Sequence, residues 1–580
     1  MNKMRQKKEE TFQTNQLSGF QFGDPDAKFD DLLLNCPQTI RGVREFLSGS
    51  KNIVLGERGV GKSALFRLVN EGKYKFASEQ TEKNRRHLIV GIDEDMNYAA
   101  ISNFVENRFI DNAKRPHGKY LFLWEIYILS RVIERLVDEF GYEVEIQTLQ
   151  EDFNEVLGVS KDRKFRLSDI LTSFKVSTGI KVDQAGSVSP TFSIEPAKDA
   201  AQSVEVTDYQ IGQFRARVRK AIRARRSVVY VLIDKIDDFV VDLAYSEQKK
   251  SIQALLECTQ ALRLPELKLK LFMRVDLFKR LNFEKGGYDK IAPQVVRLEW
   301  TADDIYGFVA RRLLFNYERQ QIRTPSWGVS LDILDFDPLI NQQVREMLVR
   351  RSIGASEKLK KIYSALILSF KMKWSQLRKP SHSERKTNSL DAILSQIVTY
   401  IFPTKVLHLT QTCKKDEILF KTFLNEHFKL GSDCANPRLI LLFLTYTLEE
   451  AVEYYERNPD EACRQLEPNE IGEYELILKE HVLRGYRKLQ INARDTATLL
   501  NARWRGPIGR LLAGLTTPKQ CIGLSIEDIH SKAAWEYGHE EFKNFIAFFS
   551  HIGLLVIENE AANFNDRHFS LPIVMRTCPA

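Results

Sequence analysis

The chain has 580 residues, of which 43% are hydrophobic and 28% charged, and its formal net charge is +8. This balance is typical of a globular protein, the length suggests three or four domains, and disorder is not the default interpretation. The modest positive charge is unevenly distributed along the chain, and the basic segments that result suit polyanions as partners.

Cysteine usage and the first residues indicate the compartment. The polar residues before Gly19 lack the apolar centre of a signal peptide, and no apolar run approaches the roughly 20 residues of a membrane span. The seven cysteines form no C-x-x-C pair and no Cys/His cluster with zinc spacing. We therefore expect a cytoplasmic protein without a membrane partner, whose cysteines are reduced.

The first part of the chain alternates between strands and helices. Residues 1–21 are polar and predict a flexible tail, and the turn-rich residues Phe22–Ala27 follow. Short apolar runs predict buried strands at Asn52–Leu55, Leu88–Ile92, Val228–Ile233, Leu267–Met273 and Val295–Leu298. A long amphipathic helix is predicted at Trp124–Phe140. This alternation predicts a parallel, three-layered α/β sheet.

An insertion at 141–207 interrupts this pattern. Ser173–Ile194 alternates apolar and polar residues around glycines, which predicts a β-hairpin. A basic helix follows, with seven Lys or Arg and no acid over 215–226. A second basic segment, 341–386, has twelve Lys or Arg against three acids, an excess of nine. Both segments suit nucleic acid, and both are equally consistent with solvated helix surface.

From Thr301 onward the pattern is helical. We predict a helical lid over 301–450 with a basic insertion at 319–389, then a helical linker over 451–504. Residues 505–580 read as three helices followed by two strands, the order of a winged helix-turn-helix. The helices are predicted at Pro507–Leu515, Ser525–Tyr537 and Glu540–His551, and the strands at Leu554–Glu558 and His568–Leu571. The core then spans 22–300, between the tail and the lid.

Gly56-Glu57-Arg58-Gly59-Val60-Gly61-Lys62-Ser63 matches the phosphate-loop pattern G-x-x-x-x-G-K-[ST] at every defined position. The glycines allow successive backbone N–H groups to point at phosphate oxygens, and the helix that continues through Ala64 adds the positive end of its dipole. Lys62 is expected to reach the β- and γ-phosphates, and Ser63 to bind Mg²⁺. The preceding strand and the following helix are the context that this pattern requires. We therefore predict ATP and Mg²⁺ as cofactors.

Asp234 ends the most hydrophobic predicted strand. A carboxylate at this position holds Mg²⁺ beside a phosphate loop, or else it caps the next helix. Many AAA+ ATPases place Glu directly after this Asp, but here the next residue is Lys235. Asp237 or Asp238 is left to orient the attacking water, or hydrolysis is slow and the protein is a nucleotide-held switch. We favour slow hydrolysis through Asp237.

Two arginines are candidates to sense the γ-phosphate. Arg274 ends the strand Leu267–Met273, which in an AAA+ sheet lies between the phosphate loop and the acidic strand; it either senses phosphate or pairs with Asp276. Arg438 opens a lid helix after Asn436-Pro437, and it either contacts the nucleotide or lies on the helix surface. Arg311 and Arg312 are weaker candidates.

Together these residues resemble the Fun(Z)-like group of bacterial P-loop ATPases of prophages and defence islands, within the AAA+/STAND kind. The resemblance covers roughly 22–446. It is carried by Phe22-Gly23-x-x-Asp26-Ala27, the phosphate loop, Ile233-Asp234-Lys235-Ile236-Asp237-Asp238, Phe272-Met273-Arg274-Val275-Asp276 and Leu298-Glu299-Trp300. It implies ATP rather than GTP, with residues 22–26 over the adenine, and a role in excluding phage.

Two classes of function follow. The first is an ATP-binding, slowly hydrolysing switch in antiviral defence, which forms a homo-oligomer and acts on a phage or host protein. The second is an ATP-gated DNA-binding protein of the replication-initiator type. Glu540, Glu541 and Asn544 on the expected recognition helix weaken the second class, because they are not basic.

Overall fold

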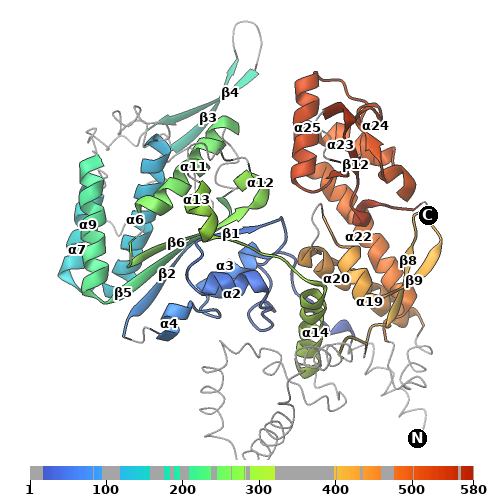
Figure 1. Ribbon diagram of the computed structural model, residues 1–580, viewed down its shortest axis with the longest axis horizontal. Coiled ribbons are helices and arrows are strands. Elements are labelled where there is room, and N and C mark those ends of the chain that lie inside the picture. The colour runs from blue at the N-terminus through green and yellow to red at the C-terminus, as the bar shows by residue number, and fades with distance from the viewer. Residues whose placement is uncertain are drawn as a thin grey trace, which may run out of the picture. The chain divides into compact units, whose positions relative to one another are not determined.

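The computed structural model describes residues 17–81, 84–93, 118–156, 175–182, 188–195, 208–236, 245–262, 264–279, 288–319, 397–399, 401–430, 435–458, 476–500, 502–559 and 564–578, and residue 281. The chain divides into two compact units (Figure 1). The core unit is Arg41–Glu299, and the lid unit combines Met1–Ile40 with Trp300–Ala580. The chain therefore passes from one unit to the other twice.

A five-stranded parallel sheet forms the centre of the core unit. Every residue of β1 and β5 is buried, as expected for parallel strands that are covered on both faces. The strand order is β2 (Arg86–Ile92), β5 (Ser227–Ile233), β6 (Leu267–Arg274), β1 (Ile53–Gly56) and β7 (Val295–Arg297). All five strands overlap runs that the sequence predicts as strands, so the α/β prediction is confirmed.

Helices cover both faces of this sheet (Figure 1). One face carries α2 (Arg41–Leu47), α3 (Lys62–Asn70) and α4 (Ala77–Thr81), where aromatic rings near the helices pack on Phe272 and Tyr230 of the strands. The other face carries the apolar cluster of α6 (Gly118–Phe140), α9 (Asp208–Ala224) and α11 (Tyr245–Ala261), with α7 (Val144–Val156) beside α6 and α9. Successive side chains of each strand point to opposite faces of the sheet, so each strand contributes to the packing on both sides.

Shorter elements complete the core unit. α12 (Val275–Lys279), α13 (Tyr288–Ile291) and η2 (Ala292–Gln294) lie between β6 and β7. The hairpin predicted at Ser173–Ile194 is confirmed: β3 (Lys175–Val182) and β4 (Val188–Glu195) are antiparallel, with Lys175 opposite Glu195 and Val182 opposite Val188.

A buried lysine fixes the turn that leads into β1. The Lys270 side chain is 0% exposed, and its Nζ donates to the carbonyl oxygens of Gly49 (2.9 Å) and Lys51 (2.5 Å) and to Oδ1 of Asn52 (3.0 Å). Three acceptors match the three donors of an ammonium group. The turn before the phosphate-loop strand is thereby held to the centre of the sheet.

The lid unit is built on helices around an aromatic core. Its helices are α14 (Ala302–Arg319), α19 (Phe420–Glu426), α20 (Pro437–Arg457) and α22 (Lys479–Leu499). The rings of Phe423, Phe428, Phe443 and Tyr486 contact one another. α20 and α22 approach closely at Gly485, where an added Cβ would lie 2.7 Å from the Cα of Thr447.

The prediction that the chain is purely helical from Thr301 to the winged helix is wrong at one place. An antiparallel hairpin of β8 (Lys405–Leu409) and β9 (Lys415–Leu419) precedes α19. β9 is largely exposed and charged, so it lacks the apolar run that marks a buried strand. The basic segment 341–386 lies outside the described residues.

The last part of the lid unit is a winged helix. α23 (Arg505–Ala513), α24 (Ile526–Lys532) and α25 (His539–His551) accompany an antiparallel sheet in the order β10 (Leu524–Ser525), β12 (His568–Ser570) and β11 (Val556–Ile557). The predicted winged helix-turn-helix is confirmed, with β10 as a strand that the sequence did not predict. Four 3₁₀ turns connect these elements: η3 (Ala502–Trp504), η4 (Pro518–Cys521), η5 (Phe564–Asp566) and η6 (Ile573–Met575).

Arg494 of α22 holds the winged helix in place within the lid unit. Its guanidinium donates to the carbonyl oxygens of Met575 (2.7 Å), Leu512 (3.2 Å) and Leu515 (2.8 Å). Two of these carbonyls lie at or just beyond the end of α23, where Lys, Arg and His side chains commonly bind the last carbonyls of a helix.

The expectation that all cysteines are reduced is wrong for one pair. Cys413, in the turn between β8 and β9, forms a disulfide with Cys578, and their Cα atoms are 5.7 Å apart. This separation lies in the normal range for a disulfide. Among the described cysteines, Cys36, Cys258 and Cys521 are buried and form no disulfide. Among the helices that the structure describes, none has both the length and the apolar character needed to cross a membrane.

Candidate functional site

The glycine loop after β1 has the backbone of a phosphate-binding loop. Gly59 and Gly61 have φ values of 80° and 102°, in the region that favours glycine. Gly61 is the N-cap of α3 and its position supplies no side-chain cap. Among the described residues, the N–H groups of Gly59, Gly61, Ser63 and Ala64 have no hydrogen-bond acceptor. A helix start with open N–H groups is a site for an anion.

Two side chains of the loop define its interior. Val60 is 5% exposed and covers Gly56, where an added Cβ would lie 2.3 Å from Cγ1 of Val60. The Nζ of Lys62 donates to the carbonyl oxygens of Gly56 (3.1 Å) and Glu57 (2.9 Å). The ammonium group is therefore held at the loop itself, in reach of anything that the open N–H groups bind.

β6 lies between β1 and β5, as the sequence predicts for the strand that carries Arg274. Arg274 is the register partner of Gly56, so both residues stand at the carboxyl edge of the sheet. The carboxyl edge of a parallel sheet is where ligands bind in open α/β folds. Arg274 is half-buried there.

Asp234 follows β5 at the same edge. It is 2% exposed, and its N–H donates to the carbonyl oxygen of Ile92 at the end of β2 (2.9 Å). Lys235 has a φ of 54°, so the chain turns immediately after the carboxylate, and Ile236 is buried behind it. The predicted water-orienting candidates Asp237 and Asp238 lie outside the described residues.

These residues fit ATP with a divalent cation. A buried carboxylate at a strand end and a hydroxyl at the first turn of α3 are hard oxygen ligands of the kind that Mg²⁺ takes. The open N–H groups and Lys62 suit a polyphosphate. Within the described residues no group of three or more His, Cys, Asp or Glu side chains is placed to hold a metal ion by itself. Ser63 and Asp234 would therefore hold the cation together with phosphate oxygens.

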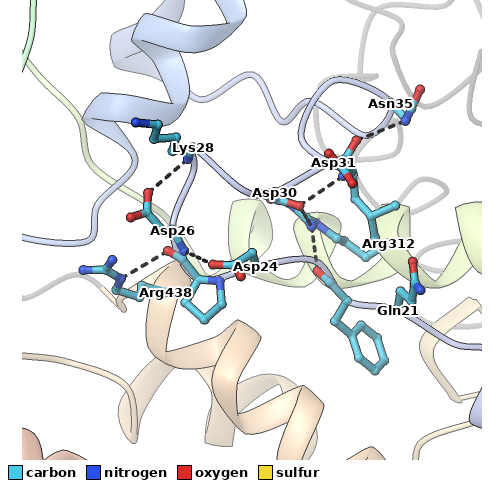
Figure 2. A network of polar contacts seen from close by, with 12 residues as sticks. Gln21, Asp24, Asp26, Lys28, Asp30, Asp31, Asn35, Arg312 and Arg438 are labelled. Atoms are coloured by element: carbon cyan, nitrogen blue, oxygen red, sulfur yellow. Dashed lines mark hydrogen bonds and ion pairs between the residues drawn. The ribbon is translucent and has the colours of Figure 1, made fainter. Parts of the chain in front are cut away.

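Arg438 begins α20 in the lid unit. Asn436 is the N-cap, its Oδ1 accepts from the Arg438 N–H (3.0 Å), and Pro437 occupies the first turn, as predicted. The Arg438 Nε donates to the carbonyl oxygen of Pro25 (3.1 Å) (Figure 2). Its two terminal nitrogens make no hydrogen bond to another described residue.

Arg312, one of the two weaker candidates for phosphate sensing, has its guanidinium engaged in a buried ion pair. It is 1% exposed and forms a two-point ion pair with Asp30, with NH1–Oδ1 and NH2–Oδ2 distances of 2.9 and 2.6 Å (Figure 2). A buried guanidinium held this way is a structural anchor. No local sequence pattern predicts this pair, because 282 residues separate its members.

The pair explains why the core unit begins at Arg41 and not at residue 22. Arg312 and Asn316 of α14 and Arg438 of α20 all bind backbone groups of Gln21–Pro25. Residues 17–40 therefore belong to the lid unit, which corrects the predicted domain boundary.

The basic run 215–226, which covers the end of α9 and the two residues after it, has most of its arginines paired inside the core unit. Five of its arginines form ion pairs with carboxylates of neighbouring elements: Arg215 with Glu125, Arg217 with Asp152, Arg219 and Arg223 with Glu266, and Arg225 with Glu143 and Glu145. Cations that already have acidic partners release less counterion from a nucleic acid. Of the two interpretations of 215–226, helix surface is the one that these contacts support.

No protein-family model matches the chain, and no curated protein matches it. Among solved structures, the Aeropyrum pernix ORC1 protein in complex with DNA is 10% identical, with a TM-score of 0.33 and 94% of each chain covered. The Aeropyrum pernix ORC2 protein in ADPNP–ADP complexes is 9% identical, with a TM-score of 0.32 and 94% of each chain covered. At this degree of similarity, the function has to be argued from the residues of the chain itself.

Proposed function

We propose that this chain binds ATP with Mg²⁺ at the loop Gly56–Ser63 and hydrolyses it slowly, as a nucleotide-held switch. The observation that carries the proposal is the row of open N–H groups at the start of α3, above the Lys62 ammonium. An anion with several oxygens satisfies these donors together.

Each site residue has a role in this proposal. The loop residues Gly56, Glu57, Arg58, Gly59, Val60, Gly61 and Ala64 cradle the phosphates through their backbone. Lys62 binds the β- and γ-phosphates, and Ser63 and Asp234 hold the cation. Bound Mg²⁺ neutralises charge on the phosphate oxygens. Arg274 and Arg438 sense whether a γ-phosphate is present. For Arg438, the support is that its two terminal nitrogens make no hydrogen bond to another described residue.

Slow turnover follows from the residue after Asp234. Lys235 carries no carboxylate to orient the attacking water, and its positive φ turns the chain away at this point. Asp237 is proposed to orient the attacking water in its place. A protein with slow hydrolysis remains in its ATP state for long periods, which suits a switch or an oligomer that assembles on ATP.

The test is calorimetry with ATP and Mg²⁺, combined with phosphate release, on the wild type and on Lys62→Ala. We expect wild-type binding, and at least about tenfold weaker binding with no phosphate release in the variant, because a charge-assisted contact is lost. Lys73→Ala is the matched control, since Lys73 is an exposed lysine just beyond α3. Absence of heat from the wild type at millimolar ATP would remove the proposal.

A second candidate is ATP-gated binding of DNA, in the manner of a replication initiator. The winged helix favours it, because this topology places a helix in the major groove in many DNA-binding proteins. The charge on α25 opposes it: Glu540 pairs with Lys543, and Glu541 pairs with Arg503. The antiviral role remains a prediction of the sequence resemblance, with a phage or host protein as the target.

Binding of the full chain to plain duplex DNA over a range of salt concentrations separates these candidates. A DNA-binding switch gives a log–log slope of several units, which steepens with each phosphate that is neutralised. A defence switch that acts on protein gives no binding at low salt with or without ATP. The second outcome would exclude DNA as a direct partner.

A further inference from the structure

The turn of the β8–β9 hairpin presents Cys413 at the surface of the lid unit. Hydrogen bonds within the turn close it: the Cys413 N–H donates to the carbonyl oxygen of Thr410 (2.9 Å), and the Lys414 N–H donates to Oγ1 of Thr410 (3.2 Å). Cys413 has a φ of 57°, so it takes the left-handed conformation at the point where the chain reverses. The backbone of the turn itself therefore fixes the position of this cysteine.

The chain after β12 carries the partner, Cys578, and is held by side chains of α22. The Nε2 of Gln490 donates to the carbonyl oxygen of Arg576 (2.8 Å), and the Nε of Arg494 donates to that of Met575 (2.7 Å). These contacts fix the chain to within two residues of Cys578. Neither of them involves a sulfur atom, so they persist whether or not the disulfide is formed.

α22 also holds the hairpin (Figure 1). β8 packs against α22, and Lys479 in the first turn of this helix forms an ion pair with Glu417 of β9 (2.7 Å). Gln490 lies roughly 16 Å further along the same helix, at a rise of about 1.5 Å per residue. The disulfide therefore closes a ring that consists of α22, the hairpin and the chain after β12.

The sulfur atoms of this pair differ in accessibility from those of the other described cysteines. Both members of the pair are partly exposed, whereas Cys36, Cys258 and Cys521 are buried. Thiol–disulfide exchange requires an outside thiolate to reach one of the two bonded sulfur atoms. Lys414 follows Cys413 directly, and a neighbouring cation favours the thiolate form of a cysteine. Among the described cysteines, this pair is the one suited to exchange with small thiols and disulfides.

We propose that Cys413 and Cys578 form a reversible thiol–disulfide clasp, which holds the winged helix on α22 when it is closed and loosens it when it is open. This regulation is separate from the proposed nucleotide binding and does not rest on it. The open form keeps the hydrogen bonds from α22 to the chain after β12 and loses the covalent link to the hairpin.

Closure needs a small disulfide oxidant, such as oxidised glutathione. The Cys413 thiolate attacks one sulfur of the oxidant, whose other half leaves as a thiolate. The Cys578 thiolate then attacks the Cys413 sulfur and releases the second half. Two electrons thus pass from the pair to the oxidant, which becomes two thiols and takes up the two protons that the cysteines lose. Opening by a thiol is the reverse of this sequence.

The test follows the full chain in buffers with different ratios of reduced to oxidised glutathione. Alkylation followed by mass measurement gives the oxidised fraction, and amide hydrogen exchange measures the opening of β12 and η6. We expect the folded wild type to pass from mainly reduced to mainly oxidised across the series. Exchange in these two elements should be about tenfold slower in the oxidised protein, because the covalent link restricts local opening.

Cys413→Ser should show the faster exchange in every buffer. Cys258→Ala is the matched control: it also removes one thiol, but in the core unit, and it should respond as the wild type does. A bridge that survives excess reduced glutathione until urea unfolds the protein would be a permanent staple, and the inference would be overturned. Failure of the bridge to form in oxidised glutathione, or equal exchange in the two forms, would overturn it as well.

Discussion

His427 lies in the aromatic core of the lid unit, where its ring is 4.4 Å from that of Phe423 and 5.6 Å from that of Tyr486, measured between ring centroids. Burial, and secondly the charge of His408, lowers the pKa of His427 to about 3. Burial likewise lowers the pKa of His481 to about 4. Both imidazoles are therefore neutral in the folded protein at neutral pH.

This burial makes the lid unit sensitive to acid. The unfolded chain takes up a proton at His427 below about pH 6.5, whereas the folded chain does so only near pH 3. The stabilising contribution is present above pH 6.5 and is lost as the pH falls. Between pH 7.5 and 5 we expect wild-type stability to fall by about 2 kcal/mol more than that of His427→Phe. Urea unfolding at the two pH values measures the difference, and parallel losses in both proteins would contradict it.

At the scale of elements, the parallel sheet and the winged helix were predictable, because each depends on local apolar patterns. β5, for example, is a run of seven residues that are all buried. The hairpin β8–β9 was missed because its second strand is mostly exposed and charged. The assignment of residues 17–40 to the lid unit was missed because no local pattern marks contacts such as Arg438 with Pro25, which are 413 residues apart.

The same division applies to the candidate site. The loop glycines and Lys62 were predictable, because they belong to a motif of eight consecutive residues. Gly59 and Gly61 have the positive φ values that this motif requires. The ion pair of Arg312 could not be predicted from the residues next to it in sequence, because Asp30 precedes the whole core unit. For α9, the positive charge was evident from the sequence. The carboxylates that form ion pairs with it were not, because they come from other elements.

At the scale of the whole molecule, the disulfide between Cys413 and Cys578 closes a loop with a sequence separation of 165 residues. Loop closure on this scale stabilises a folded chain by about 2 to 4 kcal/mol in typical cases. We expect Cys413→Ser to lower the stability of the lid unit by this amount under oxidising conditions. Addition of a reductant should lower the stability of the wild type to that of the variant.

Thiol counting before and after reduction provides the control for this experiment. The pair predicts two cysteines fewer that react with an alkylating reagent in the unfolded, unreduced wild type. Equal stability of wild type and variant in the absence of reductant, with all seven cysteines reactive, would contradict the pairing.

The double passage of the chain between the units has a consequence for synthesis on the ribosome. Every residue of the core unit emerges before α14 and α20, so its sheet is complete while residues 17–40 still lack the helices that bind them. Phe20 and Phe22, which are buried in the finished protein, are then exposed to solvent. A nascent chain that ends near residue 299 therefore presents a hydrophobic segment accessible to chaperones, which is buried only when the second half of the lid unit has been made.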